Sequence, residues 1–582
     1  MRSRINVKSF LLIVSIGLIG VSAPAHAGND TSWIPTDKNY AEPTVHSFAF
    51  TDKLALPFVH SVLSGSSQSG ATVCKSTSDT ACATKSSFQF TSILKACTTS
   101  ADTDCISEVS SFDSSGTATK AKFSKYTVSN HLNAFPADSA LGIPDGGSPS
   151  IWSIPSAPHA SGSEYAVIAG INGQVDRNGN TWAQSSVGNF IQLALVPVFL
   201  KDFGTGRQSI AAGWTQSITG IYYDYCANSQ NADGTPLVDC AHVNGDACIF
   251  PTNDQGKCYA EVPFGGVQKF NVQLKLAKEP TGWMHGRMID PAISITKAST
   301  GGVNLSVTAG ATSVPMVYQT APWASLSQKM KDIWVKCNSN QQSCSGFWLA
   351  RAPGATSSYI ELSKTMAGNA DINMIKYVDP FGAQALEIMA TIAPLVDDKS
   401  ALLSSTWSMR TLSNLEMNGS NACFTSTPGL KGIVTTNSTV YSAGPPAFKD
   451  GSLNYQVAAP HFNPDGTTPF KGNYNLVMRS DVARCIYGFS KAPISASISI
   501  VSADGNNDVA TTVAAEKDGW LSLSANNFQF SSPIIQVKFT QEAPVASAKP
   551  AAKQTTITCV KGKTTKKVTA AKPVCPNGYV KK

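Results

Sequence analysis

Short runs of β-branched and aromatic residues alternate with turn-forming residues over most of the chain. Runs at 165–171 and 190–199 have the length and composition of strands. Helical spacing of apolar residues occurs at 325–336 and at 383–392, the second ended by Pro394. The pattern therefore predicts a mainly β protein, built of antiparallel β-sandwich-like domains with disulfide-stapled loops and one or two short helices.

Turn signals and shifts in composition divide the chain. Asn172-Gly173 and Asn178-Gly179 predict type I′ turns that close hairpins. Residues 400–541 have their own strand-like runs and cysteine pair, so we expect them to fold independently. The expected organisation is a signal peptide at 1–27, an N-terminal β-rich disulfide-stapled domain at 28–262, a middle β-rich region with short helices at 263–399, a C-terminal β-sandwich-like domain at 400–541, a linker at 542–554 and a basic cysteine-paired tail at 555–582.

The first residues have the three parts of a secretory signal peptide. Arg2, Arg4 and Lys8 form a positive region, an apolar run follows at 10–21, and Ala25-His26-Ala27 is a small-x-small cleavage motif. No later apolar run reaches the eighteen residues that a spanning helix needs. The sequence therefore predicts a protein without a transmembrane segment that is secreted, extracellular or loosely attached to the cell surface.

Export changes the meaning of the fourteen cysteines, because an oxidising compartment favours disulfides. Two similar units, 74–82 and 97–105, each place their cysteines eight residues apart, which is too far for a typical zinc motif. The four cysteines between 226 and 258 allow three pairings. The pairs we expect are Cys74–Cys82, Cys97–Cys105, Cys226–Cys240, Cys248–Cys258, Cys337–Cys344, Cys423–Cys485 and Cys559–Cys575.

The net charge of +7 is unevenly distributed. The signal peptide has three positive residues, and residues 543–582 have nine lysines and no acid, which leaves the body at −5. This asymmetry argues against a nucleic-acid-binding body and predicts a tail that meets an anionic cell-envelope polymer. The alternative is a tail that only aids solubility or export. The surface-attachment residues that we expect are Lys561, Lys563, Lys566 and Lys567.

The tail also supports a resemblance. The segments 556–563 (TITCVKGK) and 572–579 (KPVCPNGY) resemble a lysine-rich tail that recurs at the end of many secreted bacterial proteins of uncharacterised function. Residues 484–493 and 516–520 are similar to a domain that often precedes that tail. The resemblance implies an extracellular location and no particular chemistry.

Motifs for catalysis, cofactors and metals are missing. The chain has no Gly-x-Ser-x-Gly elbow and no His-Glu-x-x-His. Ser-x-x-Lys at 92–95 and 294–297 is followed by no Lys-Thr-Gly. The acidic loops that begin at Asp176 and Asp504 lack the glycine and glutamate of an EF-hand. We expect no catalytic, cofactor-binding or metal-ligating residue.

One cluster has binding chemistry. Trp283, His285 and Arg287 lie between and beside Gly282 and Gly286, and such groups bind anions or carbohydrate. The alternative is a packed turn, and the aromatic run at 222–225 likewise reads as either a sugar platform or core filling.

Two functions remain open. The first is a non-enzymatic secreted or cell-surface protein with a structural, adhesive or ligand-binding role. The alternative is a secreted hydrolase acting on polysaccharide or a cell-wall polymer, with dispersed carboxylates as acid and base.

Overall fold

The computed structural model describes most of the chain from residue 45 onward, together with residues 25–27. The described residues are 25–27, 45–50, 61–67, 70–83, 85–129, 134–176, 179–182, 190–202, 215–216, 223–224, 248–252, 254, 257–266, 268–299, 301–322, 326–332, 347–350, 374–378, 380–424, 429–490, 494–501, 507–509, 515–530, 534–541 and 554–582.

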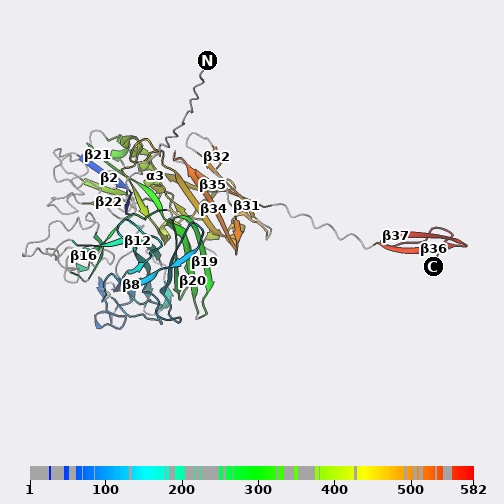
Figure 1. The fold of residues 1–582 in the computed structure, drawn as a ribbon, viewed down its shortest axis with the longest axis horizontal. Helices are drawn as coiled ribbons and strands as arrows, with labels where there is room; N and C mark the ends of the chain where they lie inside the picture. The colour runs from blue at the N-terminus through cyan, green and yellow to red at the C-terminus, as the bar shows by residue number, and fades with distance from the viewer. Residues whose placement is uncertain are drawn as a thin grey trace, which may run out of the picture.

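A large mixed sheet joins distant parts of the chain (Figure 1). Its strand β18 (Gly282–Arg287) lies between β25 (Ser408–Thr411), to which it is antiparallel, and β26 (Leu430–Thr436), to which it is parallel. The main path is β33 (Ala515–Lys517), β34 (Trp520–Phe528), β30 (Gly472–Arg479), β26, β18, β25, β12 (Phe190–Asp202), β10 (Glu164–Asp176), β5 (Ser87–Ile93), β3 (Val62–Ser67) and β4 (Gly70–Val73). Further strands paired to it are β8 (Lys122–Tyr126), β9 (Ser150–Ser153), β11 (Gly179–Trp182), β15 (Cys248–Pro251) and β16 (Lys257–Glu261).

An antiparallel five-stranded sheet packs on one face of the large sheet. Alternation along its strands buries Leu305 and Val307, while Ser306 between them is only partly covered. These apolar side chains share one core with Tyr165 and Leu193 of the large sheet. The order is β19 (Ile289–Lys297), β20 (Val303–Gly310), β17 (Lys269–Leu276), β6 (Cys105–Phe112) and β7 (Ala118–Lys120).

A second sheet packs on the other face, over β18, β26 and β30. Neighbouring residues of β26 show the two faces, because Ile433 lies in the first core and Val434 lies in a second core with Leu453 and Val537. The protein therefore has three layers here. The strands of this outer sheet are β27 (Val440–Tyr441), β28 (Ala447–Lys449), β29 (Ser452–Ala458), β35 (Ile534–Gln541), β31 (Ile494–Val501) and β32 (Asn507–Val509).

A third sheet includes the predicted cleavage motif. Residues Ala25–Ala27 form β1, an edge strand that runs parallel to β24 (Leu402–Thr406). The order is β1, β24, β21 (Thr312–Pro322), β2 (Val45–Phe50), β23 (Met374–Val378) and β22 (Phe347–Ala350). A separate two-stranded pair joins β13 (Thr215–Gln216) and β14 (Tyr223–Asp224).

The helices are short. Helix α3 (Ala383–Ile392) confirms the second helix expected from the sequence, and a 3-10 turn at Ala393–Val396 follows it. Its Ile388 packs in one cluster with Met330, which lies in the helical segment 328–332 of the first expected helix. The other helical elements within the described residues are α4 (Asn414–Met417), α5 (Ser480–Tyr487) and the 3-10 turns η2 (Thr80–Cys82) and η8 (Ala422–Phe424).

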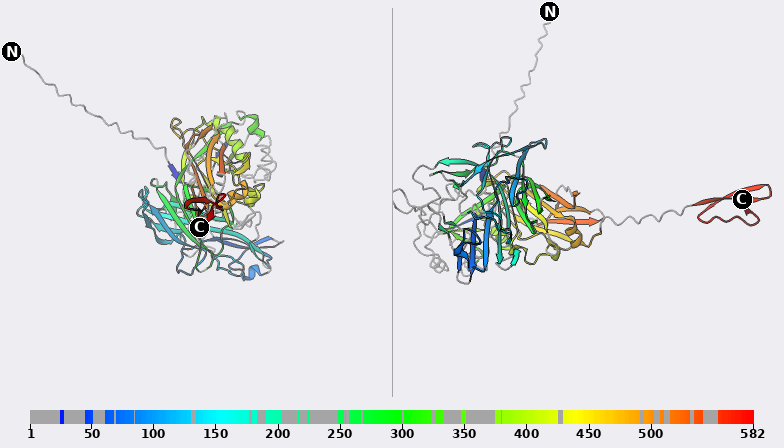
Figure 2. Two further views of the ribbon diagram at one scale, coloured as in Figure 1. Left: turned by 90° about the vertical axis from the view of Figure 1, so that its right-hand side faces the viewer. Right: turned by 90° about the horizontal axis from the view of Figure 1, so that it is seen from below.

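The chain ends in its own three-stranded sheet, which we call the C-terminal module (residues 555–582). Strand β36 (Thr555–Lys561) is central and pairs with β37 (Thr564–Ala570) and β38 (Val580–Lys581). None of these strands joins the other sheets, and the module stands apart from them in Figure 1 and in the right-hand view of Figure 2.

The mainly β fold is confirmed, but two details differ from expectation. The turn expected at Asn172-Gly173 is wrong, because β10 continues through it with Asn172 opposite Phe190. Asn178 lies outside the described residues. The large sheet also crosses the expected boundaries: it takes strands from 28–262, 263–399 and 400–541. Strand pairing therefore does not set 400–541 apart.

Candidate functional site

Trp283, His285 and Arg287 lie on strand β18, in the interior of the large sheet. Side chains two residues apart share a face of a strand, so all three point to the layer that contains β27 and β29. The alternative of a packed turn is correct about the packing and wrong about the turn, since hydrogen-bonded strands flank β18 on both sides.

The three side chains are buried. The exposed fraction is 1% for Trp283, 4% for His285 and 1% for Arg287. Trp283 packs edge-on against Phe424 with ring centroids 5.0 Å apart. His285 stacks on Tyr441 with ring centroids 3.7 Å apart and an interplanar angle of 4°. This burial argues against a surface site for sugar or anion at these residues.

Arg287 binds the backbone of the segment between β26 and β27. Its Nη1 donates to the carbonyl oxygens of Thr436 at 3.0 Å and Ser438 at 2.6 Å. Its guanidinium also lies 4.7 Å from the centroid of the Tyr441 ring. A buried charge needs such partners, so Arg287 fixes the path of this connection across the sheet.

A second buried arginine lies next to this cluster. Arg410 on β25 makes two hydrogen bonds to Glu416, at 2.8 Å from Nη1 to Oε2 and 2.7 Å from Nη2 to Oε1. Ser413 donates to the same carboxylate through its backbone N–H at 3.0 Å. Burial raises the pKa of Glu416, but the charge and hydrogen bonds of Arg410 and the hydrogen bonds from Ser413 together outweigh that effect. The pKa of Glu416 therefore lies below its usual value.

His285 is neutral in this environment. Burial lowers its pKa well below the usual value, and the charges of Arg287 and Arg410 lower it further. Its Nε2 is buried and has no hydrogen-bond partner within the described part of the chain. The spacing Trp-x-His-x-Arg in the sequence is compatible with a strand, because alternate residues of a strand share one face and these three side chains would then point the same way.

Carboxylates for hydrolysis are not brought together at this cluster. Glu416 and Glu261 are the buried acidic residues among those the structure describes. Glu416 is held by Arg410 in a core ion pair, whereas glycoside hydrolases use two carboxyl groups that face the substrate.

Four of the seven expected disulfides are present in the structure. They join Cys74 to Cys82, Cys97 to Cys105, Cys423 to Cys485 and Cys559 to Cys575. The pairs expected for Cys226–Cys240, Cys248–Cys258 and Cys337–Cys344 involve side chains outside the described residues and stay predictions.

The two similar cysteine units share one structural device. In each unit, an aspartate five residues after the first cysteine accepts a hydrogen bond from the backbone N–H of the residue next to that cysteine. The Lys75 N–H donates to Asp79 at 2.8 Å, and the Thr98 N–H donates to Asp102 at 2.6 Å. The Lys75 hydrogen bond favours the ionised form of Asp79 and lowers its pKa. The pKa of Asp102 is lowered first by the Thr99 hydroxyl and N–H and then by the Thr98 N–H. The repeated sequence therefore reflects a repeated loop geometry.

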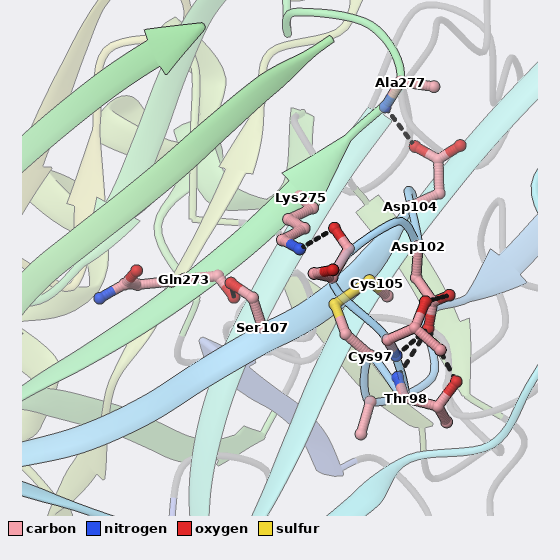
Figure 3. Close-up of a disulfide and its surroundings, with 12 residues drawn as sticks. Cys97, Thr98, Asp102, Asp104, Cys105, Ser107, Gln273, Lys275 and Ala277 are labelled. Atoms are coloured by element: carbon pink, nitrogen blue, oxygen red, sulfur yellow. Dashed lines mark hydrogen bonds between the residues drawn. A yellow bond between two sulfur atoms is a disulfide. The ribbon is translucent and has the colours of Figure 1, made fainter. Parts of the chain in front are cut away.

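Strand β17 holds the second of these loops against the five-stranded sheet (Figure 3). Lys275 Nζ donates to the Ser100 carbonyl at 2.7 Å, and the Ala277 N–H donates to Asp104 Oδ1 at 2.9 Å. Asp104 has a left-handed backbone with φ of 52°. Burial raises its pKa against the opposing effect of the Ala277 hydrogen bond.

The C-terminal module places its lysines on two faces. Lys561 lies opposite Thr564, beside the turn at Gly562, whose φ is 58°. Lys566 lies opposite Cys559 and Lys567 opposite Thr558, so these neighbouring lysines point to opposite faces. Lys561, Lys563, Lys566 and Lys567 are all exposed, but the register does not gather them into one patch.

The described residues offer neither a metal site nor a membrane-spanning helix. No three His, Cys, Asp or Glu side chains among them are close enough to hold a metal ion. No helix there is long and apolar enough to cross a membrane.

Comparison with protein families, with curated proteins and with solved structures found no match for this chain. The fold and the sites define it as a mainly β, disulfide-bonded protein with a small basic module at its end.

Proposed function

We propose that this chain is an exported, non-enzymatic protein that attaches to an anionic polymer or membrane surface of the cell envelope through its C-terminal module. The large β body then serves a structural, adhesive or ligand-binding role at that surface. The signal peptide, the disulfides and the tail composition support this proposal.

The observation that carries it is the charge of the C-terminal module. Residues 555–582 include seven lysines and no acidic residue. All seven are exposed, on a sheet closed by the Cys559–Cys575 disulfide. Like charges held close together repel one another, and an anionic partner relieves that repulsion.

The magnitudes fit weak and reversible attachment. Each lysine near an anionic surface contributes about 1 kcal/mol, and salt confines the effect to about 8 Å. Because Lys566 and Lys567 point to opposite faces, a flat surface contacts only part of the set. The whole module therefore supplies on the order of 2–4 kcal/mol rather than the sum over all its lysines.

A binding experiment tests this attachment. The intact protein and a variant ending at Gln541 are compared for binding to isolated cell envelopes over a series of salt concentrations. We expect the intact protein alone to bind, with affinity that falls as salt rises. Equal binding of both proteins, or binding that ignores salt, would rule the module out as the anchor.

A full-length control separates charge from the mere presence of the module. Lys561, Lys563, Lys566 and Lys567 are changed together to Gln, which leaves Cys559–Cys575 in place. This variant should bind as weakly as the shortened protein. If the shortened protein fails to bind but the lysine-to-glutamine variant binds fully, the charge of these lysines is not the cause of attachment.

A further inference from the structure

The C-terminal module has one covered face and one open face. In the antiparallel register, directly opposite residues share a face. Ile557 therefore shares one face with Val568, and Cys559 with Lys566. The residues between them on β36 point the other way.

The chain after β37 covers the first face. Ile557 is 8% exposed and Cys559 is fully buried, with Cys559 bonded to Cys575 of the covering segment. Tyr579 of the same segment lies under Lys566, whose Nζ is 5.5 Å from the ring centroid. The lysines on this face are Lys561, Lys566 and Lys581. Of these, Lys566 is partly engaged within the module by its contact with Tyr579.

The second face is open. Its side chains form three rows across the sheet: Thr556 opposite Thr569, Thr558 opposite Lys567, and Val560 between Thr565 and Val580. Every one of these residues is exposed or only partly covered, and Val580 keeps 71% of its surface exposed. We call this set the threonine face.

We propose that the threonine face binds a strand of acidic polysaccharide, with Lys567 contacting its anionic groups and the threonine hydroxyls contacting its sugar hydroxyls. This inference rests on the proposed function and names the ligand class and the surface used. The three rows run from Thr556 to Val560 of β36 and make a track about 13 Å long on which an extended chain can lie.

The chemistry of the face favours a polysaccharide over a lipid membrane. Each threonine hydroxyl both donates and accepts hydrogen bonds, as sugar hydroxyls do. Val560 and Val580 supply a small apolar patch with no long or aromatic side chain to enter a lipid layer. The positive charge of the module, without any acidic residue, complements carboxylate or sulfate groups on the sugar chain.

Strand β37 offers matched controls, because its sequence Thr564-Thr565-Lys566-Lys567 sends equal residues to opposite faces. The test is made on the full chain with the variant Thr565→Val/Thr569→Val on the threonine face. The control is Thr555→Val/Thr564→Val on the covered face. Valine keeps the shape and strand preference of threonine and removes the hydroxyl. At residue 569 the change also removes the 2.7 Å hydrogen bond between the Thr556 and Thr569 hydroxyls.

The probes are sodium alginate as an acidic polysaccharide, poly-glutamate as a polyanion without sugar, and vesicles containing anionic phosphatidylserine. We expect Thr565→Val/Thr569→Val to weaken binding to alginate about tenfold, the loss of two hydrogen bonds, and Thr555→Val/Thr564→Val to leave it unchanged. Lys567→Gln should weaken it about fivefold and Lys566→Gln about twofold. Non-reducing mass analysis checks that each variant keeps Cys559–Cys575.

Two results would overturn the inference. One is an equal effect of the two threonine pairs on alginate binding. The other is binding to poly-glutamate or to the vesicles as tight as binding to alginate. If the variant ending at Gln541 still binds cell envelopes, the proposed function itself fails. If that variant loses binding while Thr565→Val/Thr569→Val keeps it, only the threonine face is refuted.

Discussion

Arg410 and Glu416 form a two-pronged ion pair inside the protein, with side-chain exposures of 6% and 3%. The pair lies on β25 and the short helix α4 that follows, beside the buried strand β18. Removing one partner leaves the other charge buried and unpaired, which is more costly than replacing both.

Glu416→Gln should therefore destabilise the protein by about 3–5 kcal/mol. The double variant Arg410→Met/Glu416→Leu should recover most of that loss, because it leaves no unpaired charge. Denaturant unfolding of the three proteins measures the difference. A double variant as unstable as Glu416→Gln would contradict this account.

Acid should weaken the same pair. The pKa of Glu416 is lower in the folded protein than in the unfolded chain, so its contribution is complete above a pH of about 4.3 and is lost as the pH falls through the folded-state value. The double variant Arg410→Met/Glu416→Leu lacks this carboxyl group and should lose less stability than the unchanged protein between pH 5 and pH 3. This range covers about one pH unit on either side of an ordinary glutamate pKa. Unfolding curves over that range test it.

His285 should impose a different pH dependence. Its pKa is lowered on folding, so below a pH of about 6.5 the unfolded chain takes up a proton that the folded protein excludes. Stability should fall by up to about 1.4 kcal/mol per pH unit as the pH decreases. His285→Phe keeps a ring to stack on Tyr441 and should reduce this slope.

A second histidine serves as the reference for that experiment. Burial also lowers the pKa of His159, which remains in the variant, so a smaller slope should persist. An unchanged slope in His285→Phe would show that His285 is not excluded from protonation.

The Cys423–Cys485 disulfide should contribute more to stability than the short ones. It joins cysteines 62 residues apart, against 8 for Cys74–Cys82. Loop-closure entropy gives about 4 kcal/mol for the first and about 2.5 kcal/mol for the second. Thermal unfolding of the paired Cys→Ala variants should show the larger loss for Cys423–Cys485. The opposite order would count against the entropic account.

Residues 400–541 should not melt cooperatively as an isolated fragment, although the sequence predicts an independent domain. In the protein, β18 separates β25 from β26 and supplies pairing to both. Without it, the two strands lose a neighbour and their apolar faces meet water. The fragment, expressed in an oxidising compartment, tests this by calorimetry. A sharp two-state transition would restore the boundary at 399/400.

Local features could be read from the sequence and long-range pairing could not. The cysteine pairs at 74–82 and 97–105 are close in the chain, and α3 has a clear apolar spacing with a proline after it. By contrast, nothing local in 282–287 says that residues 408–411 and 430–436 will flank it. The burial of Arg287 escaped prediction for the same reason, since its hydrogen-bond partners come from the distant segment at 436–439.

The strand order of the large sheet also affects when its central strand can form during synthesis of the chain. Strand β18 ends at Arg287, and its two neighbours begin about 120 and 140 residues later, at Ser408 and Leu430. At ordinary rates of synthesis the ribosome needs on the order of 10 s to reach them. Until then β18 has no neighbour to bond with, so the centre of the sheet stays open while the chain emerges. Such non-local pairing slows folding and leaves the unpaired strand edges exposed to aggregation until the chain reaches residue 436.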